Sequence, residues 1–265
     1  MVHVEIRAEP LFQLGPLTVT NSMLGAVIAA LVLLTLFAYV LQRWRPVPGR
    51  LQSLVELGFE FIVNVVRGQG GSRWRSYVPH IATIFLFILV ANWLGLVPGV
   101  GTIGHYEEAE DGERILVPFV RAAAADLNFT LGLAIVSFVA FVGWGVRVQG
   151  VGGYLRELAT PWYITPIHVV SELSRLISLS MRLFGNVFAG EVLLVVIAAI
   201  APMAIFAFMG LELVFGLVQA LVFALLTMTY ISISTAAQHG VEAHDGSDAA
   251  HAAEPEPISP APATG

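Results

Sequence analysis

The segment Ser178-Leu-Ser-Met-Arg-Leu-Phe-Gly-Asn-Val-Phe-Ala-Gly-Glu191 places an arginine in the middle of an apolar run long enough to cross a membrane. A permanent cation at membrane depth is costly, and such residues commonly mark an ion pathway or a charge partner. The guanidinium group of Arg182 keeps its proton, so it requires an anion, water or a polar cavity. This requirement is the strongest indication of function in the sequence.

The composition is that of a polytopic membrane protein. The chain has 265 residues, of which 57% are hydrophobic and 12% charged, with a mean hydropathy of +0.79. Soluble domains carry about twice that charged fraction. There is no cysteine, and all 13 basic residues are arginine. These absences exclude thiol chemistry, Cys-based metal sites and lysine-based mechanisms of the Schiff-base or Walker type. We expect no cofactor, no metal and no nucleic-acid partner.

The apolar runs predict an all-α fold with a single membrane domain over 23–237. Two long helices, 166–200 and 203–236, form a hairpin around Ala201-Pro202. Each is about 50 Å long at 1.5 Å per residue, whereas a bilayer core is about 30 Å thick, so strong tilt is expected. Three other uncharged runs have the length of steep spans: 23–41, 80–97 and 129–146.

Arginine placement predicts the orientation in the membrane. The arginine-rich segment between the first two spans is expected in the cytoplasm, and its amphipathic stretch 51–66 is expected to be an interfacial helix. The acidic loop after the second span is expected outside. The N-terminal segment 1–22 is then external. The Ala-, Pro- and acid-rich segment 238–265 is predicted to be a disordered cytoplasmic tail.

On a helical wheel, a narrow stripe of small and polar residues lies within about 40° of Arg182. In lipid, such a stripe should face protein or water. A helix–helix contact sealed by small residues remains an alternative for the serines, but such a contact does not need a fixed charge. The stripe consists of His168, Ser171, Arg175, Ser178, Arg182, Asn186 and Ala189.

An antiparallel hairpin about Pro202 places residues whose numbers sum to about 403 at equal depth. Glu191 is then level with Glu212, and Arg182 lies about 14 Å deeper, within one turn of Gln219. Glu191 is nine residues from Arg182 and therefore on the opposite side of the helix. The anion that meets Arg182 is expected to come from elsewhere.

Further acidic residues extend this polar set. Two carboxyl groups at one level in a low dielectric should not both ionise, so Glu191 and Glu212 could hold and pass a proton; separate structural hydrogen bonds are the alternative. Asp126, in Ala125-Asp-Leu-Asn128, could deliver protons from outside or could cap a helix. On the cytoplasmic side of Arg182, three residues form a second polar patch, in which Glu172 is the best relay candidate: His168, Ser171 and Glu172.

At Met181-Arg-Leu-Phe-Gly-Asn-Val-Phe-Ala-Gly-Glu191 the sequence resembles subunit a of the F-type ATP synthase. In that family, subunit a is the stationary subunit of the proton-driven rotary motor in the membrane. The resemblance covers about Thr18 to Ser234 in the same order and spacing. It is also carried by Ala125-Asp-Leu-Asn128, Gln219-Ala-Leu-Val-Phe-Ala-Leu-Leu-Thr-Met-Thr-Tyr230 and Pro48-Gly-Arg-Leu-Gln-Ser-Leu-Val-Glu56.

The resemblance implies a non-catalytic subunit of a bacterial plasma membrane complex that couples proton translocation to rotation. The implied partners are the c-subunit ring, the b subunits of the peripheral stalk, the lipid bilayer and, indirectly, the F1 sector. The positions implied for the ion path are Arg182, Asn186 and Gln219 at the rotor, Glu191, Glu212 and Asp126 in the external half-channel, and His168, Ser171 and Glu172 toward the cytoplasmic half-channel.

The chain departs from the family pattern at three places. Leu176 occupies a position where many relatives have proline. Glu191 and Glu212 are both acids where relatives often carry one histidine, which leaves proton or sodium coupling open. His168 stands where relatives tend to carry an acid, and Glu172, one turn further on, could replace it.

Two other classes of function are alternatives. A self-contained secondary transporter or proton channel usually shows internal repeats and helices broken at mid-membrane. Neither feature is evident, although Gly185 and Gly190 could permit some unwinding. A structural membrane anchor would not need Arg182. Co-isolation with a small hydrophobic ring protein favours the turbine subunit, and ion uptake by this chain alone favours the transporter.

Overall fold

The structure, a computed structural model, describes residues 9–15, 17–43, 45, 48–100, 103–108, 114–159, 163 and 165–251, apart from the side chains of 14, 17, 106–108, 114–117, 157–159, 168 and 236–251. Long helices dominate the described residues, and the prediction of an all-α polytopic membrane protein is confirmed. Five stretches are long and apolar enough to cross a membrane. The helices are α1 (Asn21–Gln42), α2 (Arg50–Gln69), α3 (Trp74–Gly95), α4 (Leu127–Ala159), α5 (Thr165–Ile200) and α6 (Ile205–His251).

Each predicted helix corresponds to an observed one, with differences at the ends. α3 starts at Trp74, six residues before the predicted uncharged run 80–97. The added turns include Arg75, and arginine is a good helix former; Pro79 also lies within the helix. α4 continues to Ala159 across a break at Gly150, whose φ of 76° suits glycine.

The helical backbone of α6 also continues past its predicted end near Ala236, as far as His251. The added stretch is rich in alanine, the strongest helix former. Residues 252–265 lie outside the described part of the chain, and the disordered tail over 238–265 stays a prediction.

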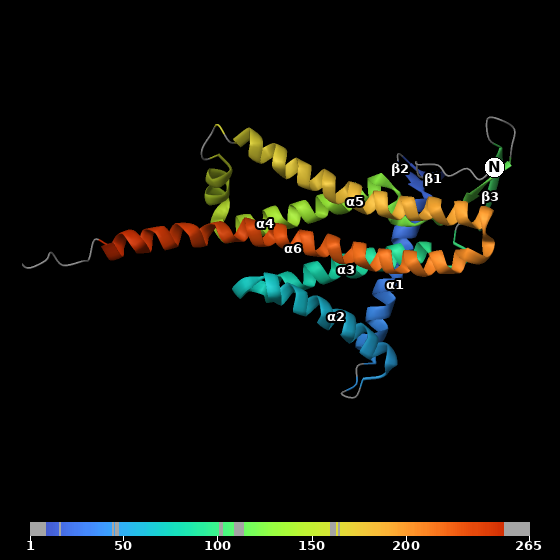
Figure 1. Cartoon of the computed structure of the whole chain (residues 1–265), viewed down its shortest axis with the longest axis horizontal. Helices are drawn as coiled ribbons and strands as arrows, with labels where there is room; N and C mark the ends of the chain where they lie inside the picture. The colour runs from blue at the N-terminus through green and yellow to red at the C-terminus, as the bar shows by residue number, and fades with distance from the viewer. Residues whose placement is uncertain are drawn as a thin grey trace, which may run out of the picture.

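Figure 1 shows α3, α4, α5 and α6 side by side, with α1 running across their direction. α5 and α6 form the predicted antiparallel hairpin through the short turn η3 (Pro202–Ala204). α2 packs on α3 and leads back from the far end of α1. At 1.5 Å per residue, α1 is about 33 Å long and matches a bilayer, so helices that cross its direction are strongly inclined to the membrane normal.

Two short β-hairpins were not predicted. Strands β1 (Pro10–Leu14) and β2 (Leu17–Thr20) pair antiparallel, as do β3 (Gly104–Glu108) and β4 (Arg114–Pro118). Each strand has four or five residues, too few for an alternating pattern to be read with certainty in sequence. Both hairpins lie at the end of the molecule that carries the α5–α6 turn (Figure 1).

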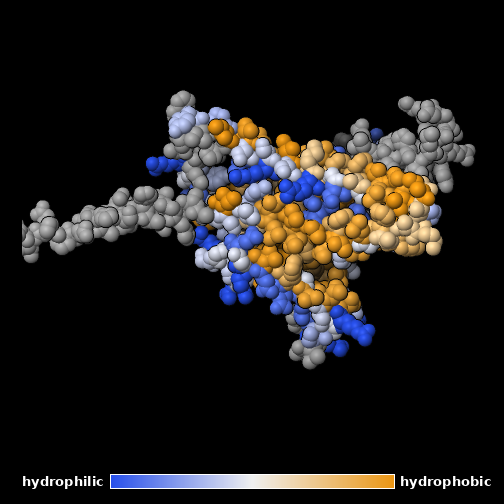
Figure 2. All heavy atoms as spheres, in the orientation of Figure 1, coloured by the Kyte–Doolittle hydropathy of each residue, from blue (hydrophilic) through white to orange (hydrophobic). Residues whose placement is uncertain are grey.

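The core lies between α3, α4, α5 and α6, where Tyr77 packs edge-on against Trp144 with ring centroids 5.0 Å apart. The outer surface of the hairpin is apolar, with hydrophilic residues along α5 (Figure 2). An apolar surface of this kind suits lipid or a membrane-embedded partner. Fully buried core side chains include Ile81, Ile88, Leu183, Phe223, Met228 and Ile231.

The segment that precedes α4 is pressed into the bundle. The short helix η2 (Ala123–Ala125) is buried, with exposures of 1%, 0% and 0% for its three alanines. On the α1 side, a Cβ atom at Gly25 would overlap the backbone carbonyl oxygen of Arg121. Small residues therefore allow this segment to lie between α1, α3 and α5, and they fix the position of Arg121.

Candidate functional site

Arg182 lies on the outward side of α5. Leu179, Leu183 and Val187 define the buried face of this helix, whereas Arg182 is exposed. Within the part of the chain that the structure describes, its guanidinium group makes no hydrogen bond or ion pair. This agrees with the expectation that the anion for Arg182 comes from outside the local helix.

Most of the described side chains of the stripe also face outward. Ser171, Ser178 and Ala189 are exposed and Asn186 is half-buried. The side chain of His168 lies outside the described residues. The exposed serines do not form a seam within this chain, so the stripe is a surface that remains open to a partner.

Arg175 differs from Arg182 because it has an internal anion. Its Nη1 lies 2.8 Å from Oε1 of Glu172, one turn earlier, and its guanidinium carbon lies 5.3 Å from the centroid of the Tyr230 ring. Glu172, the predicted relay, is thus one half of an ion pair, with its Oε2 buried and unbonded among the described residues. Such i,i+3 pairs are common on helix surfaces.

Gln219 lies on the inner face of α6. Its side chain is 8% exposed, next to buried Ala220, and its Nε2 has no hydrogen-bond partner among the described side chains. The hairpin arithmetic predicts that Gln219 and Arg182 lie within one turn of each other in depth. In the structure, however, the side chain of Gln219 is buried and that of Arg182 is exposed.

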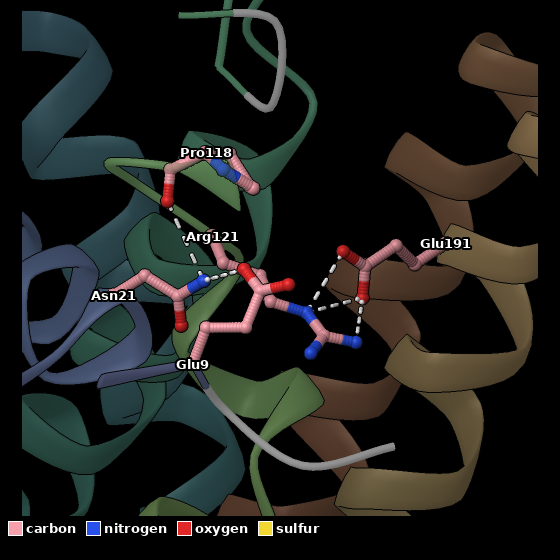
Figure 3. Close-up of polar contacts among 5 residues, drawn as sticks. All are labelled: Glu9, Asn21, Pro118, Arg121 and Glu191. Atoms are coloured by element: carbon pink, nitrogen blue, oxygen red, sulfur yellow. Dashed lines mark hydrogen bonds and ion pairs between the residues drawn. The ribbon is translucent and has the colours of Figure 1, made fainter. Parts of the chain in front are cut away.

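Glu191 is held by Arg121, a contact that sequence reasoning missed. Nε of Arg121 donates to both carboxylate oxygens at 3.0 Å, and Nη2 lies 2.9 Å from Oε2 (Figure 3). Arg121 is 6% exposed and Glu191 29%. In the sequence, Arg121 is simply an arginine at the end of an acidic loop. Its partner Glu191 lies 70 residues further along the chain, so the sequence alone does not indicate that the two meet.

A second polar contact ties the N-terminal segment to this end of the bundle. Nδ2 of the buried Asn21 donates to Oε2 of Glu9 at 3.2 Å and to the carbonyl oxygen of Pro118 at 3.5 Å (Figure 3). The amide of Asn21 therefore bridges the start of α1 and the end of β4, next to the loop that carries Arg121.

Glu212 lies level with Glu191, as the hairpin arithmetic requires. Its carboxyl group packs directly against Gly190, so closely that a Cβ atom at Gly190 would overlap it. No hydrogen bond or ion pair joins Glu212 to any other described residue. The two acids thus share a level, and of the two it is Glu191 that has a cation within the described part of the chain.

α3 holds the turn of α6 that follows Glu212. Nδ2 of Asn92 donates to the Gly216 carbonyl oxygen at 3.2 Å, and Nε1 of Trp93 donates to the Leu213 carbonyl oxygen at 3.1 Å. Gly216 permits the close approach, because a Cβ atom there would lie 3.3 Å from Cβ of Asn92. Side-chain donors to two helical carbonyls fix the position of α6 next to the acid.

Asp126 caps α4. Its Oδ1 accepts the backbone N–H of Asn128 at 2.9 Å, as expected of an N-cap residue, and its side chain is 6% exposed. One turn further on, the buried hydroxyl groups of Thr130 and Ser180 lie 3.1 Å apart and join α4 to α5. The capping alternative is therefore realised, and a role of Asp126 in proton delivery stays a prediction.

These features define a class: a polytopic α-helical membrane protein built around a long antiparallel helix pair that presents on its surface an arginine without a partner among the described residues. A sequence model of the family described as ATP synthase A chain matches residues 23–232. The chain is 33% identical over 245 residues to ATP synthase subunit a of Gloeobacter violaceus, covering 91% of this chain and 92% of that protein. It is 37% identical over 224 residues to ATP synthase subunit a of Mycobacterium ulcerans, covering 80% and 86% of the two chains.

The chain therefore belongs to the ATP synthase subunit a family. It is a multi-pass membrane protein of the F0 sector, with a place in proton transport and ATP synthesis.

Proposed function

We propose that the chain is the stator channel subunit of its ATP synthase and that Arg182 faces the c-subunit ring. The observation that supports this most directly is the exposed guanidinium group of Arg182, without an anion among the described residues, on a polar stripe within an apolar helix. A cation at membrane depth needs an anion, water or a polar cavity, and a carboxylate from another chain can supply the anion. The ion-binding carboxylate of a passing c subunit meets this need.

The proposed path has two offset halves. Protons enter from outside past Asp126 and through the level of Glu191 and Glu212, and they neutralise a rotor carboxylate. After nearly a full turn, the carboxylate releases its proton toward the patch of His168, Ser171 and Glu172. Arg182 separates the halves because its charge keeps the carboxylate facing it ionised and repels a proton that would pass straight through. Asn186 and Gln219 flank the arginine along the hairpin.

The proposed orientation places the N-terminus outside a bacterial plasma membrane and the C-terminus in the cytoplasm. Both β-hairpins and the α5–α6 turn gather at one end, which the arginine distribution assigns to the outside (Figure 1). The b subunits of the peripheral stalk hold the chain still against the rotor and link it indirectly to F1. The chain itself binds no nucleotide.

Disulfide cross-linking tests the rotor-facing stripe. The chain has no native cysteine, so every cross-link must use an introduced thiol. We expect Ser178→Cys and Asn186→Cys to form disulfides with a cysteine placed beside the c-subunit carboxylate. Leu183→Cys is the matched control on the same helix, because Leu183 is fully buried in this chain. Cross-linking at Leu183 but at neither stripe position would contradict the proposal.

Gly190→Ala tests the placement of Glu212. The added methyl group overlaps the Glu212 carboxyl group, the mobile end of a flexible side chain, so the acid should move while the fold persists. We expect normal amounts of assembled complex, with ATP-driven proton pumping lowered on the order of tenfold. Gly185→Ala, with nothing within 4 Å of the new Cβ, is the control and should pump normally. Normal pumping by the Gly190 variant would contradict a role for this position of Glu212.

A further inference from the structure

We propose that Arg67, Trp74 and Arg75 form a binding site for the headgroup of an anionic phospholipid, at the junction between α2 and α3. The ligand group is the phosphate of the lipid, and the arginines supply the charge that recognises it. The site lies outside the proposed ion path, so the proposal does not depend on the role of Arg182.

A tight glycine turn folds the end of α2 onto the start of α3. Gly70 caps α2, and a Cβ atom there would lie 2.7 Å from Cα of Trp74. Gly71 follows with a φ of 54°, a conformation that favours glycine. The turn therefore brings Arg67, in the last turn of α2, back to the residue that begins α3.

Two guanidinium groups meet at the ring of Trp74. The guanidinium carbon of Arg67 lies 4.7 Å from the ring centroid and that of Arg75 lies 5.4 Å from it. The two charges are thus no further apart than these distances added together. Both arginines are exposed, and neither forms an ion pair with an acid in the part of the chain that the structure describes. Like charges held this close create a positive potential that favours a bound anion.

The junction is preformed for a phosphate group. Guanidinium groups offer planar pairs of N–H donors that match two phosphate oxygens. The neighbouring Gln69 is fixed to α6, because the Ser232 hydroxyl group donates to its carbonyl oxygen at 3.1 Å and the Thr229 hydroxyl group donates to its Oε1 at 3.3 Å. Since the turn and the ring already hold the arginines, little conformational freedom is lost on binding.

An exposed apolar face on α2 favours a lipid as the source of the phosphate. Leu57 is nine residues from the buried Val66 and therefore on the opposite side of the helix. Three apolar side chains are exposed on that side: Leu54, Leu57 and Phe61. A phospholipid supplies acyl chains for this face and a phosphate for the arginines. A free phosphate ion or an acidic protein segment supplies only the charge.

The place of the junction along the chain also fits a lipid headgroup. Trp74 lies near the start of the membrane-length stretch Gly71–Gly95, and tryptophan is enriched at the ends of membrane spans. Figure 1 shows the junction at the end of α3 that lies away from the β-hairpins. The proposed orientation assigns this end to the cytoplasmic leaflet, whose anionic lipids attract basic residues.

Photo-labelling of the intact, purified ATP synthase tests the site. The probe is a phosphatidylglycerol with a diazirine next to its headgroup, and peptide mass spectrometry locates the label, which we expect within residues 66–78. Arg67→Gln and Arg75→Gln should each lower labelling about fivefold, and the double variant should lower it about thirtyfold, because the arginines contribute independently. Arg50→Gln removes an exposed arginine at the other end of α2 and should label normally.

Two competitors distinguish the sources of the phosphate in the native complex. Unlabelled phosphatidylglycerol should displace the probe, whereas phosphatidylcholine and millimolar inorganic phosphate should not. Displacement by inorganic phosphate would indicate a site for the free ion and would overturn the proposal. Absence of label from residues 66–78 would mean that another subunit covers the patch, with the same consequence.

Labelling is expressed per assembled complex, so poor assembly of a variant cannot imitate lost binding. Unchanged labelling in an assembled double variant would contradict the site. The competition requires no substitution, so it decides between the outcomes even where the double variant fails to assemble. Loss of the proposed channel function would appear separately, as pumping that survives the removal of Arg182.

Discussion

Arg182→Ala is expected to lower the rate of ATP-driven proton pumping by at least about a hundredfold. The guanidinium group is exposed on α5 and unpaired within the described residues, so its removal breaks no internal contact and the complex should assemble. In the proposed mechanism, loss of the cation lets a proton pass between the two half-channels without rotation. Vesicles that carry the variant should therefore show a passive leak under an imposed proton gradient, together with ATP hydrolysis that is no longer coupled to pumping.

Two further variants test whether the effect belongs to the fixed charge. Met181→Ala changes an apolar side chain that is 50% exposed on the adjacent position of the helix, and it should pump normally. Arg182→Lys keeps a cation but loses the planar guanidinium, and lysine can release its proton at membrane depth, so pumping should remain far below normal. Full pumping by Arg182→Ala would contradict the mechanism.

Gly25→Ala is expected to be the most damaging substitution of a residue that carries no polar side chain. The new Cβ would overlap the backbone carbonyl oxygen of Arg121, and a backbone atom cannot rotate away as a side chain can. Overpacking of this type costs about 1–3 kcal/mol or more. The displaced segment carries the cation that binds Glu191, so both the amount of assembled complex and its pumping should fall.

Gly132→Ala in α4 is the matched control for this substitution. Gly132 is exposed, with nothing within 4 Å of an added Cβ, so alanine should stabilise the helix by up to about 1 kcal/mol. Complex recovered from detergent and its thermal denaturation measure both variants. Equal stability of the two would show that α1 and the loop before α4 do not pack as described.

The helices could be predicted from sequence because membrane spans depend on local properties, namely apolar length and the positions of charges. The prediction that Glu212 lies level with Glu191 in the hairpin is also confirmed, because the Glu212 carboxyl group packs on Gly190, the residue next to Glu191. Both results follow from the fixed rise and rotation of a helix. The outward position of Arg182 follows from the same regularity.

The partners of the charged groups could not be predicted in the same way. Arg121 and Glu191 are 70 residues apart, and only the packing of the η2 segment against α1 and α5 brings them together. The ion pair of Arg175 with Glu172 was within reach, since their spacing of three residues is typical of helical pairs. The inward turn of Gln219 depends on which face of α6 meets the core, and over residues 205–235 apolar residues occur on every side of this helix, so the sequence does not show which face that is.

The crossing of α1 over the other helices has a consequence for the shape of the ion route. With α1 upright in the bilayer, α5 extends sideways more than it descends (Figure 1). The 19 positions from Glu172 to Glu191 then correspond to about 28 Å measured mostly along the membrane plane. In the proposed mechanism, the mouths of the two passages are accordingly displaced along an arc of the rotor's circumference, and a carboxyl group of the rotor joins them by travelling around the axis.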